Sequence, residues 1–594
     1  MNQPDTHVSG KNSKIHPQPG FSVTRRHFAQ IAAFSAGAAL VPRAITAKSR
    51  SSTAFQLDNP PSNSQNADQE LVLPFDPYGQ EVFLDPHRAA DWGPFWVMLP
   101  YVWSGLLAFD ENGAVVPDLA ESVTPGDDAS TWTCTIRHGI TFASGKPVTA
   151  QHFVDSWKRA LDPANLAPMV GYMAHVNGFD AFIAGESGDI GFEVTDDRTI
   201  VITLSEPVSD FPAHLATFVW AVIDLEQVAA APLDFPLNDA GAGQWRFTEF
   251  ADGDHITMQQ NPRYWDGQSP SIGTITWPFM DSIAAASEGL DRYRNDEIAS
   301  LDVPISMLQS IRDDEALNAD LQSIDLNGST LAIGMDFNQE PFNDVRIRQA
   351  IASAVDKDAW ANDIWQGTYV PAASFTPPST AEIAGYSPPT APEFDPSRAA
   401  DLLSEAEFTT GDAQIDIVYY QPATDSPEDQ ERHAALLQMI EDACGIRIRQ
   451  DTSKTTEQIA GLQSDLGGRQ FDIVWWWANS DTPSLLATVG HSESPFMQGW
   501  FNWSPELEPT DGEVAEASAA FDEHIGAATS ELDASARNDS YAEAEKLLLD
   551  NAVYVPLGYW KQQYIQKPWL KGTRQGPWSG RIPVRIDKDV TIER

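Results

Sequence analysis

The residues whose types and spacing point most clearly to chemistry lie close together between positions 475 and 483. Three consecutive tryptophans, Trp475, Trp476 and Trp477, are followed by Asn479 and Asp481. Indole rings offer large flat walls to an apolar, planar or cationic molecule through stacking or cation–π contact. Side chains alternate along a strand, so at least one of the three rings must face away from its neighbours. The run favours reversible binding of a small molecule; the alternative is that all three rings pack the interior.

Signatures of catalysis and of metal binding are absent from the sequence. It contains no His-Glu-x-x-His, no Gly-x-Ser-x-Gly and no phosphate-binding glycine-rich loop with lysine, and its twelve histidines are scattered. A lone histidine such as His87 is more often a structural hydrogen-bonding group than a ligand. With 85 acidic residues, two neighbouring carboxylates have no diagnostic value. We therefore expect no catalytic residue, no bound metal and no cofactor.

The two cysteines, Cys134 and Cys444, lie 310 positions apart. Two cysteines form neither a disulfide framework nor a four-cysteine metal site. We expect both to be buried free thiols.

The formal net charge of −48 excludes one class of partner. A charge of this size opposes binding to nucleic acid and favours solubility, so we expect no nucleic-acid partner. The acidic composition is compatible with adaptation to a salty environment and equally with ordinary solubility.

The first fifty residues have the pattern of an export signal. Arg25, Arg26 and Phe28 precede an apolar, alanine-rich run at 29–42, which is too short to cross a bilayer as a stable helix. The paired arginines resemble the twin-arginine signal. We expect a signal peptide over 1–47 and a flexible leader, rich in Ser, Asn, Gln and Pro, over 48–68. No cysteine follows the signal closely, so we expect a periplasmic protein without a lipid anchor.

Strand-like and helix-like patterns alternate through the rest of the chain, which predicts an α/β fold. In the helix expected from 343 on, Arg346 and Arg348 should face solvent or pair with acids, and a surface loop is expected over 376–392. Strands are predicted over 131–137, 199–204, 255–260, 415–420, 446–450 and 471–477, and helices over 151–160, 343–359, 397–405 and 430–443.

A series of motifs in a fixed order covers residues 70–575. Read along the chain, they are Leu84-Asp85-Pro86-His87, Pro117-Asp118-Leu119-Ala120-Glu121-Ser122, Ser144-Gly145-Lys146-Pro147, Asp155-Ser156-Trp157-Lys158-Arg159-Ala160-Leu161-Asp162-Pro163, Asn261-Pro262-Arg263-Tyr264-Trp265, Pro341-Phe342-Asn343-Asp344-Val345-Arg346 and Tyr554-Val555-Pro556-Leu557. Together they resemble the extracytoplasmic solute-binding proteins of the oligopeptide, dipeptide and nickel family. Most of these residues are expected to build the scaffold, so they predict the fold better than the ligand.

The resemblance implies a two-lobed periplasmic binding protein of the type II kind, with an additional inserted domain and with lobes hinged around a buried ligand cleft. By this analogy we expect the first lobe at 69–103, 224–267 and 563–594. The inserted domain is expected at 104–223 and the second lobe at 268–562. Ligand binding would close the lobes, and the closed form would dock on a membrane permease.

The resemblance also implies ligand contacts. A Trp-x-Ala-Asp-Tyr-x-x-Pro run lines the family's cleft, and its aspartate pairs with the amino group of a bound peptide. Here Asn479 takes the aspartate position, and an amide lacks the full charge that a desolvated ammonium needs. Asp481 is a possible substitute. Further candidates are Met169, at a position where relatives have tyrosine, Trp245 after the loop Gly241-Ala242-Gly243-Gln244, and, more weakly, Trp103 and Asp91.

The expected function is capture of a peptide or peptide-like small solute by a monomer that delivers it to the permease of an ABC transporter. A non-peptide solute, such as an oligosaccharide, an opine or a metal chelate, is an alternative, and a sensor receptor is another. An enzyme is the least favoured class.

Overall fold

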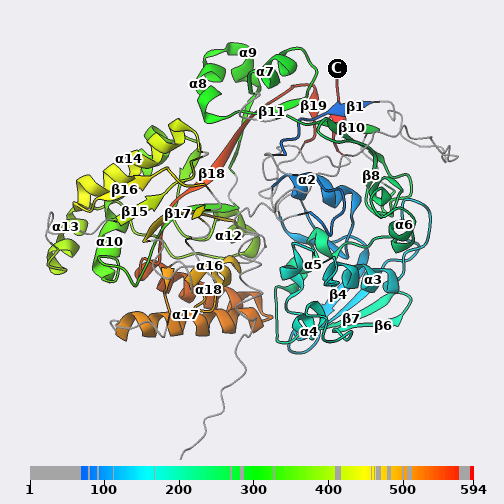
Figure 1. Cartoon of the computed structure of the whole chain (residues 1–594), viewed down its shortest axis with the longest axis horizontal. Helices are drawn as coiled ribbons and strands as arrows, with labels where there is room; N and C mark the ends of the chain where they lie inside the picture. The colour runs from blue at the N-terminus through cyan, green and yellow to red at the C-terminus, as the bar shows by residue number, and fades with distance from the viewer. Residues whose placement is uncertain are drawn as a thin grey trace, which may run out of the picture.

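The computed structural model describes residues 69–594 except 78–80, 90–92, 111–112, 166, 268–270, 281–285, 326–327, 409–416, 424, 456–457, 460–461, 463–469, 478–482, 495, 498–500, 505–511 and 574–588. Figure 1 shows two lobes side by side, joined at one end of the molecule. Sheets and helices occur in both, which confirms the two-lobed α/β architecture.

The first lobe is built on a four-stranded sheet in the order β1-β10-β9-β8 (Figure 1). β1 pairs in parallel with β10, about two hundred residues later, and the other pairs are antiparallel. In β9 the buried residues Ile256 and Met258 alternate with less buried ones, as the sequence pattern predicts. The bounds are β1 Glu70–Val72, β8 Trp245–Ala251, β9 His255–Gln260 and β10 Thr274–Pro278, with α2 Gly93–Val102, α6 Leu225–Ala230 and η3 Phe235–Leu237 beside them.

A second four-stranded sheet, ordered β4-β5-β7-β6, lies in the same lobe. Helix α3 packs on it through Phe153 and Trp157, which are fully buried. Thr149 precedes this helix, and its backbone N–H donates to Nδ1 of His152 at 3.1 Å, as expected of an N-cap. The bounds are β2 Leu107–Phe109, β3 Val115–Pro117, β4 Ala120–Pro125, β5 Thr131–Ile136, α3 Ala150–Leu161, η1 Val170–Met173, α4 Phe179–Ile183, β6 Phe192–Asp196, β7 Thr199–Thr203, α5 Phe211–Leu215 and η2 Phe218–Trp220.

The second lobe is built around strands β17, β13 and β18, with a helical layer on each side (Figure 1). All seven residues of β13 are buried because both faces of the sheet are covered. One layer comprises α10 Val345–Ala354, α13 Pro396–Glu405 and α14 Pro427–Cys444, with the strand pair β15 Ile417–Tyr420 and β16 Ile448–Asp451. The other comprises α16 Leu485–Gly490, α17 Gly512–Ser530 and α18 Ala534–Asp550. The central strands are β13 Ser329–Met335, β17 Phe471–Trp477 and β18 Tyr554–Gln566.

Strand β18 links the two lobes. Its first part pairs with β13, and its last part pairs with β12 and β11 near the end where the lobes join (Figure 1). Beyond it, Lys567 N donates to Ala299 O, and Ala299 N donates to Val72 O in the first sheet, both at 2.9 Å. We expect the hinge between the lobes at this junction. Its other elements are α7 Ala286–Arg294, β11 Ser300–Asp302, α8 Ile305–Asp313, α9 Glu315–Asp320, β12 Leu321–Asp325, β19 Leu570–Lys571 and β20 Thr591–Ile592. β14 Tyr369–Pro371 pairs with β18 within the second lobe.

Two local expectations were wrong. The predicted helix over 343–359 is interrupted after Ala354: Asp356 caps the short α11 (Lys357–Ala359), which continues into η4 (Trp360–Ile364). The expected loop over 376–392 contains the helix α12, Pro378–Ala384. Arg348 does not face solvent: it is fully buried, its Nη1 donates to Phe342 O at 2.6 Å, and its charge helps to lower the pKa of the Asp344 carboxyl. Arg346 does pair with an acid.

Both cysteines are buried free thiols, as predicted. The division into lobe segments stays a prediction, with one adjustment from the strand pairing. A boundary at 267 would separate β10 from β9 and β1, to which it is hydrogen-bonded. We therefore place that boundary after Pro278.

Candidate functional site

The three consecutive tryptophans lie on β17, and its register fixes the direction of their side chains. β17 pairs antiparallel with β13, which places Trp477 opposite Ser329. Trp475 packs with the core on the α10, α13 and α14 side, and Trp476 belongs to the core on the α16–α18 side. The predicted alternation of neighbouring rings is confirmed.

Trp475 lies in a cluster of aromatic rings, of which Trp360 and Tyr369 are buried and the others half-buried. Its ring centroid is 5.4 Å from Trp560 on β18 and 6.2 Å from Tyr369 on β14. Tyr369 in turn lies 5.1 Å from Trp365 and 4.9 Å from Trp360. We call these five residues the aromatic cluster. The four partners of Trp475 could not be predicted from the sequence, because they lie far from Trp475 along the chain and only strand pairing brings them together.

Trp476 has a packing role. It is buried, with its ring 4.7 Å from Phe496 and 5.6 Å from Tyr554. These edge-to-face contacts fix the end of β17 against the helices behind it. Trp476 therefore supports the site from inside the lobe.

The segment that follows β17 lies outside the described residues. This applies to Asn479 and Asp481, to the side chain of Trp477, and also to Asp91. The backbone of Trp477 is placed by its pairing with β13, so the predicted site begins at a defined point, the carboxyl end of β17.

Trp103, Trp245 and Met169 belong together in the core of the first lobe. Each is at most 2% exposed, and Trp103 Nε1 donates to Leu84 O at 2.8 Å. The structure brings these three residues into one core, separate from the two cores that hold Trp475 and Trp476.

The loop before Trp245 needs its glycines for a close approach of two backbones. Gly243 N donates to Val102 O at 3.0 Å, at the end of α2. A β-carbon at Gly243 would lie 2.3 Å from Tyr101 O, and one at Gly241 would lie 2.3 Å from Val102 O. Both positions therefore exclude larger residues. The loop fixes α2 against the first sheet.

A buried ion pair joins the Leu84–His87 motif to helix α3. Arg159 Nη2 lies 2.6 Å from Asp85 Oδ2, and Arg159 Nη1 lies 2.8 Å from His87 Nδ1. Burial lowers the pKa of His87 to about 3, so the ring is neutral near neutral pH. Burial opposes ionisation of Asp85, but the hydrogen bond from Arg159 and the other favourable contacts lower its pKa overall. His87 is therefore a structural histidine, as predicted.

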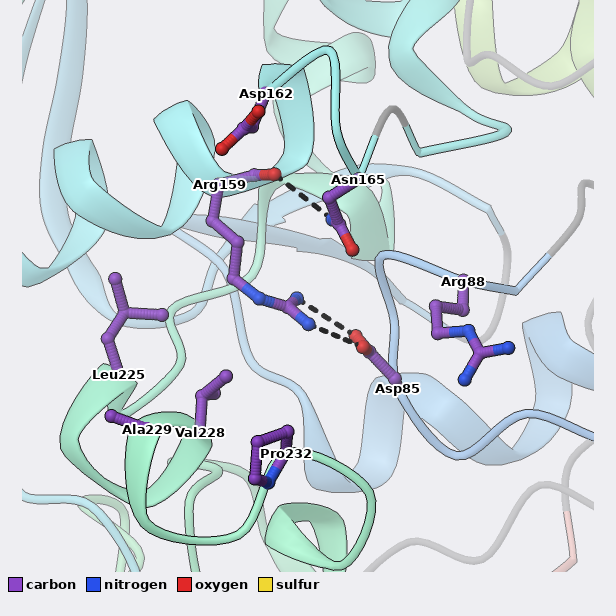
Figure 2. A pocket seen from close by; sticks show the side chains of 9 residues that line it. All are labelled: Asp85, Arg88, Arg159, Asp162, Asn165, Leu225, Val228, Ala229 and Pro232. Carbon is purple, nitrogen blue, oxygen red and sulfur yellow. Dashed lines mark hydrogen bonds and ion pairs between the residues drawn. The ribbon is translucent and has the colours of Figure 1, made fainter.

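A surface pocket of about 580 Å³ lies beside this ion pair (Figure 2). The ion pair forms one side, and an apolar wall from α6 and the following turn forms the other. Of the predicted ligand residues that the structure describes, none lines the pocket. Its lining consists of Asp85, Arg88, Arg159, Asp162, Asn165, Leu225, Val228, Ala229 and Pro232.

Buried ionisable groups in the second lobe hold the segment around 372–392. The carboxylate of Glu545 accepts hydrogen bonds from Phe375 N at 2.8 Å and Thr376 N at 2.9 Å. Lys357 Nζ donates to the carbonyls of Ala372 and Pro392, and burial lowers its pKa to about 8. Perturbed pKa values often mark catalytic sites, but backbone groups engage both of these side chains. They act as structural clamps.

Metal-binding groups and membrane-spanning helices can be assessed in the part of the chain that the structure describes. Within it, no three or more His, Cys, Asp or Glu side chains are grouped so that they could hold a metal ion. Within the same residues, the helices are too short or too polar to cross a membrane.

The sequence of the chain is similar to those of known proteins. The family of bacterial extracellular solute-binding proteins, family 5 (middle region), matches residues 114–499. The periplasmic oligopeptide-binding protein OppA of Salmonella typhimurium is 27% identical over 539 residues, covering 88% of this chain and 92% of that protein. The probable deoxycholate-binding periplasmic protein YgiS of Escherichia coli is also 27% identical, over 86% of this chain and 92% of that protein.

Solved structures share the fold. The unliganded open form of MppA, a periplasmic murein tripeptide-binding protein, superimposes with a TM-score of 0.72 at 23% identity, covering 88% of this chain and 97% of that one. Haemophilus influenzae OppA in complex with the peptide RPPGFSPFR gives a TM-score of 0.61 at 20% identity, covering 89% and 99% of the two chains.

Proposed function

The chain belongs to the bacterial extracellular solute-binding proteins of family 5, and from this we propose that it is the substrate-binding component of an ABC importer. In this role it captures a peptide or peptide-like small solute outside the cytoplasm and delivers it to a membrane permease. The observation that carries the proposal is the family match over residues 114–499. The two-lobed fold supports it, because hinged lobes can enclose a solute.

We place the ligand site at the carboxyl end of β17. Trp477, Asn479 and Asp481 are proposed to contact the solute, with the aromatic cluster around Trp475 beside them. The core positions of Met169, Trp103 and Trp245 support a scaffold role, so we rank them, with Asp91, below the β17 residues as contacts.

The ligand class follows from the charge at this site. An ammonium group that leaves water needs a full opposite charge or several good acceptors. Asn479 supplies only a carbonyl acceptor, so recognition of a peptide amino group would depend on Asp481. If Asp481 does not take this role, a neutral or non-peptide solute fits better. The naming of one relative for deoxycholate binding makes that alternative concrete.

The proposed action is binding without covalent change. Aromatic walls stabilise a solute by stacking, and closure of the lobes removes it from water. A dissociation constant of about a micromolar, equivalent to about −8 kcal/mol, would be sufficient for a scavenging receptor.

We further propose the export route, the location and the macromolecular partner of the protein. Arg25, Arg26 and Phe28 direct twin-arginine export, and the mature protein works in the periplasm as a monomer without a nucleic-acid partner. Its macromolecular partner is the permease.

Native mass spectrometry of the freshly purified protein tests the proposal, because a tight solute remains bound through gentle purification. The expected result is a mass excess that denaturation removes. Calorimetry with the identified solute then compares Trp477→Ala with Trp569→Ala, a tryptophan of the first lobe far from the site. We expect weaker binding only for Trp477→Ala, by about tenfold or more. Equal affinities in the two variants would remove the site assignment.

A further inference from the structure

The two lobes touch at the end of the molecule opposite the hinge. Figure 1 places helix α17 there, next to the lobe that contains α4 and α5. Ser209, two residues before α5, donates its backbone N–H to Thr529 O at 2.7 Å. Its hydroxyl Oγ lies 3.4 Å from Ala528 O. Both acceptors belong to the last turn of α17, so these bonds join residues 319 and 320 positions apart in the chain.

This contact is equivalent to a cap at the C-terminus of helix α17. The hydrogen-bond donors of the cap come from a distant part of the chain. The last four carbonyls of a helix have no partner within the helix and carry partial negative charge. Ser209 provides donors for two of them and is itself only 7% exposed. Its neighbours Val208 and Asp210 are also buried, and Val208 N donates to Ala129 O at 3.2 Å. The first lobe therefore holds Ser209 in place, and Ser209 donates hydrogen bonds to the second lobe.

Acidic side chains of the two lobes lie near each other beside the contact. Glu206 of the first lobe and Glu493 of the second lie near enough to interact electrostatically. On its own side Glu206 lies 3.3 Å from His175 Nδ1. On the other side Asp522 accepts a hydrogen bond from Ser492 N at 3.0 Å.

We propose that Ser209 and the last turn of α17 form a latch that holds the lobes together opposite the hinge, and that repulsion between the Glu206 and Glu493 carboxylates limits its strength. The latch rests on the hinged closure of the proposed function. Rotation about the β18 junction separates this end of the molecule most, so opening must break the Ser209 bonds. The latch thus contributes to closure before any solute is bound.

Protons should strengthen the latch. Partial burial raises the pKa of Glu493, the nearby His491 opposes this, and the carboxylates of Asp522 and Glu206 raise it further. The part of this increase that comes from Glu206 exists only when the lobes are together. The closed form therefore holds the Glu493 proton more tightly than the open form, and closure weakens as the pH rises through that pKa. Salt, which screens the two carboxylates, should act in the same direction as acid.

Further titratable groups around the contact are Asp210, next to Ser209, and three histidines. His491 Nε2 lies 3.8 Å from Asp522 Oδ1, and the His175 ring lies 5.2 Å from that of His214. Burial lowers the pKa of His214 to about 4, so it stays neutral where Glu493 titrates.

The experiment measures the distance between the lobe ends in the full protein without added solute. Spin labels are placed on the exposed positions Glu186→Cys and Ser535→Cys, and the two native cysteines are buried. Pulsed electron paramagnetic resonance then gives the ratio of short to long distances. Ser209→Asp removes the hydroxyl donor and sets a carboxylate against the helix C-terminus, so this ratio should fall about fivefold, as expected for one net hydrogen bond.

Two further variants complete the test. Gln151→Glu adds the same charge at an exposed position of α3 and should leave the ratio unchanged. Glu493→Gln should raise the ratio about twofold and reduce its dependence on pH and salt. An identical ratio in Ser209→Asp and wild type overturns the latch, and an unchanged ratio in Glu493→Gln overturns the role of the carboxylates. If Ser209→Asp fails to fold, Ser209→Ala, which removes only the hydroxyl donor, takes its place, and an unchanged ratio in that variant overturns the latch. Failure of the protein to bind any solute would refute the proposed function without affecting this measurement.

Discussion

His433 offers a sharp test of how burial controls stability in the second lobe. Its ring lies on α14 in contact with the aromatic cluster, 6.0 Å from Trp365, and its Nδ1 is 2.7 Å from the hydroxyl of Tyr419. Burial lowers the pKa of His433 to about 4, with Asp429 and Arg432 acting in opposite directions. The folded lobe therefore contains a neutral imidazole, whereas the unfolded chain binds a proton near the ordinary pKa of 6.5.

The sign and size of the effect follow from this difference. The unfolded state takes up more protons than the folded state between the two pKa values, so stability falls as the pH drops from about 6.5 towards 4. Between about pH 7.5 and about pH 5 this single group should reduce the free energy of unfolding by about 2 kcal/mol. His433→Gln keeps a hydrogen-bonding partner for Tyr419 but does not titrate, so it should lack this loss.

Hydrogen exchange followed by mass spectrometry on peptides from α14 measures the local free energy of opening at both pH values. We expect the wild type to lose about 2 kcal/mol more than His433→Gln between them. His255→Gln is the matched control with the opposite sign. The hydrogen bond that the His255 ring donates to Asp254 raises the pKa of His255, so its contribution to stability is present at low pH and lost as the pH rises. Equal pH dependence of α14 in wild type and His433→Gln would refute the reasoning.

Three further predictions concern the scaffold and export. Arg348→Met should lower the free energy of unfolding by about 3 kcal/mol in urea denaturation, because it leaves two buried carbonyls without donors. An unchanged midpoint would contradict this. Gly243→Ala should lower the free energy of unfolding by about 2 kcal/mol or more in the same assay, because the added methyl group collides with Tyr101 O. Wild-type stability in this variant would show that the loop accommodates the methyl group without cost. Replacing Arg25 and Arg26 with lysine should leave the precursor in the cytoplasm in a fractionation experiment, and normal export would exclude the twin-arginine route.

Local patterns in the sequence were sufficient for many individual elements. The alternating runs at 131–137, 199–204 and 255–260 correspond to β5, β7 and β9, because each of these strands has one face in a core. The amphipathic pattern over 151–160 corresponds to α3 for the same reason. Helix α12 escaped prediction because its turn-rich sequence was interpreted as a loop, although Pro378 at its start and Gly385 at its end are residues that bound helices well.

Long-range contacts set the limit of the sequence analysis. The burial of Arg348 depends on a carbonyl of Asn551, about two hundred residues away. Likewise, Trp560 meets Trp475 only because β13 lies between β17 and β18 and positions both strands. The residue types at 475–483 were sufficient to identify this run as a candidate site. They did not distinguish Trp476, which packs inside the lobe, from Trp475 in the aromatic cluster.

The most direct test of the account is small-angle X-ray scattering of the mature protein with and without the solute identified by native mass spectrometry. Closure of two hinged lobes predicts a smaller radius of gyration in the presence of solute, saturating at one equivalent and reversing on dialysis, with the solute recovered chemically unchanged. A scattering curve that stays the same at saturating solute, or a solute recovered as a different compound, would contradict the claim that this chain closes reversibly around its ligand.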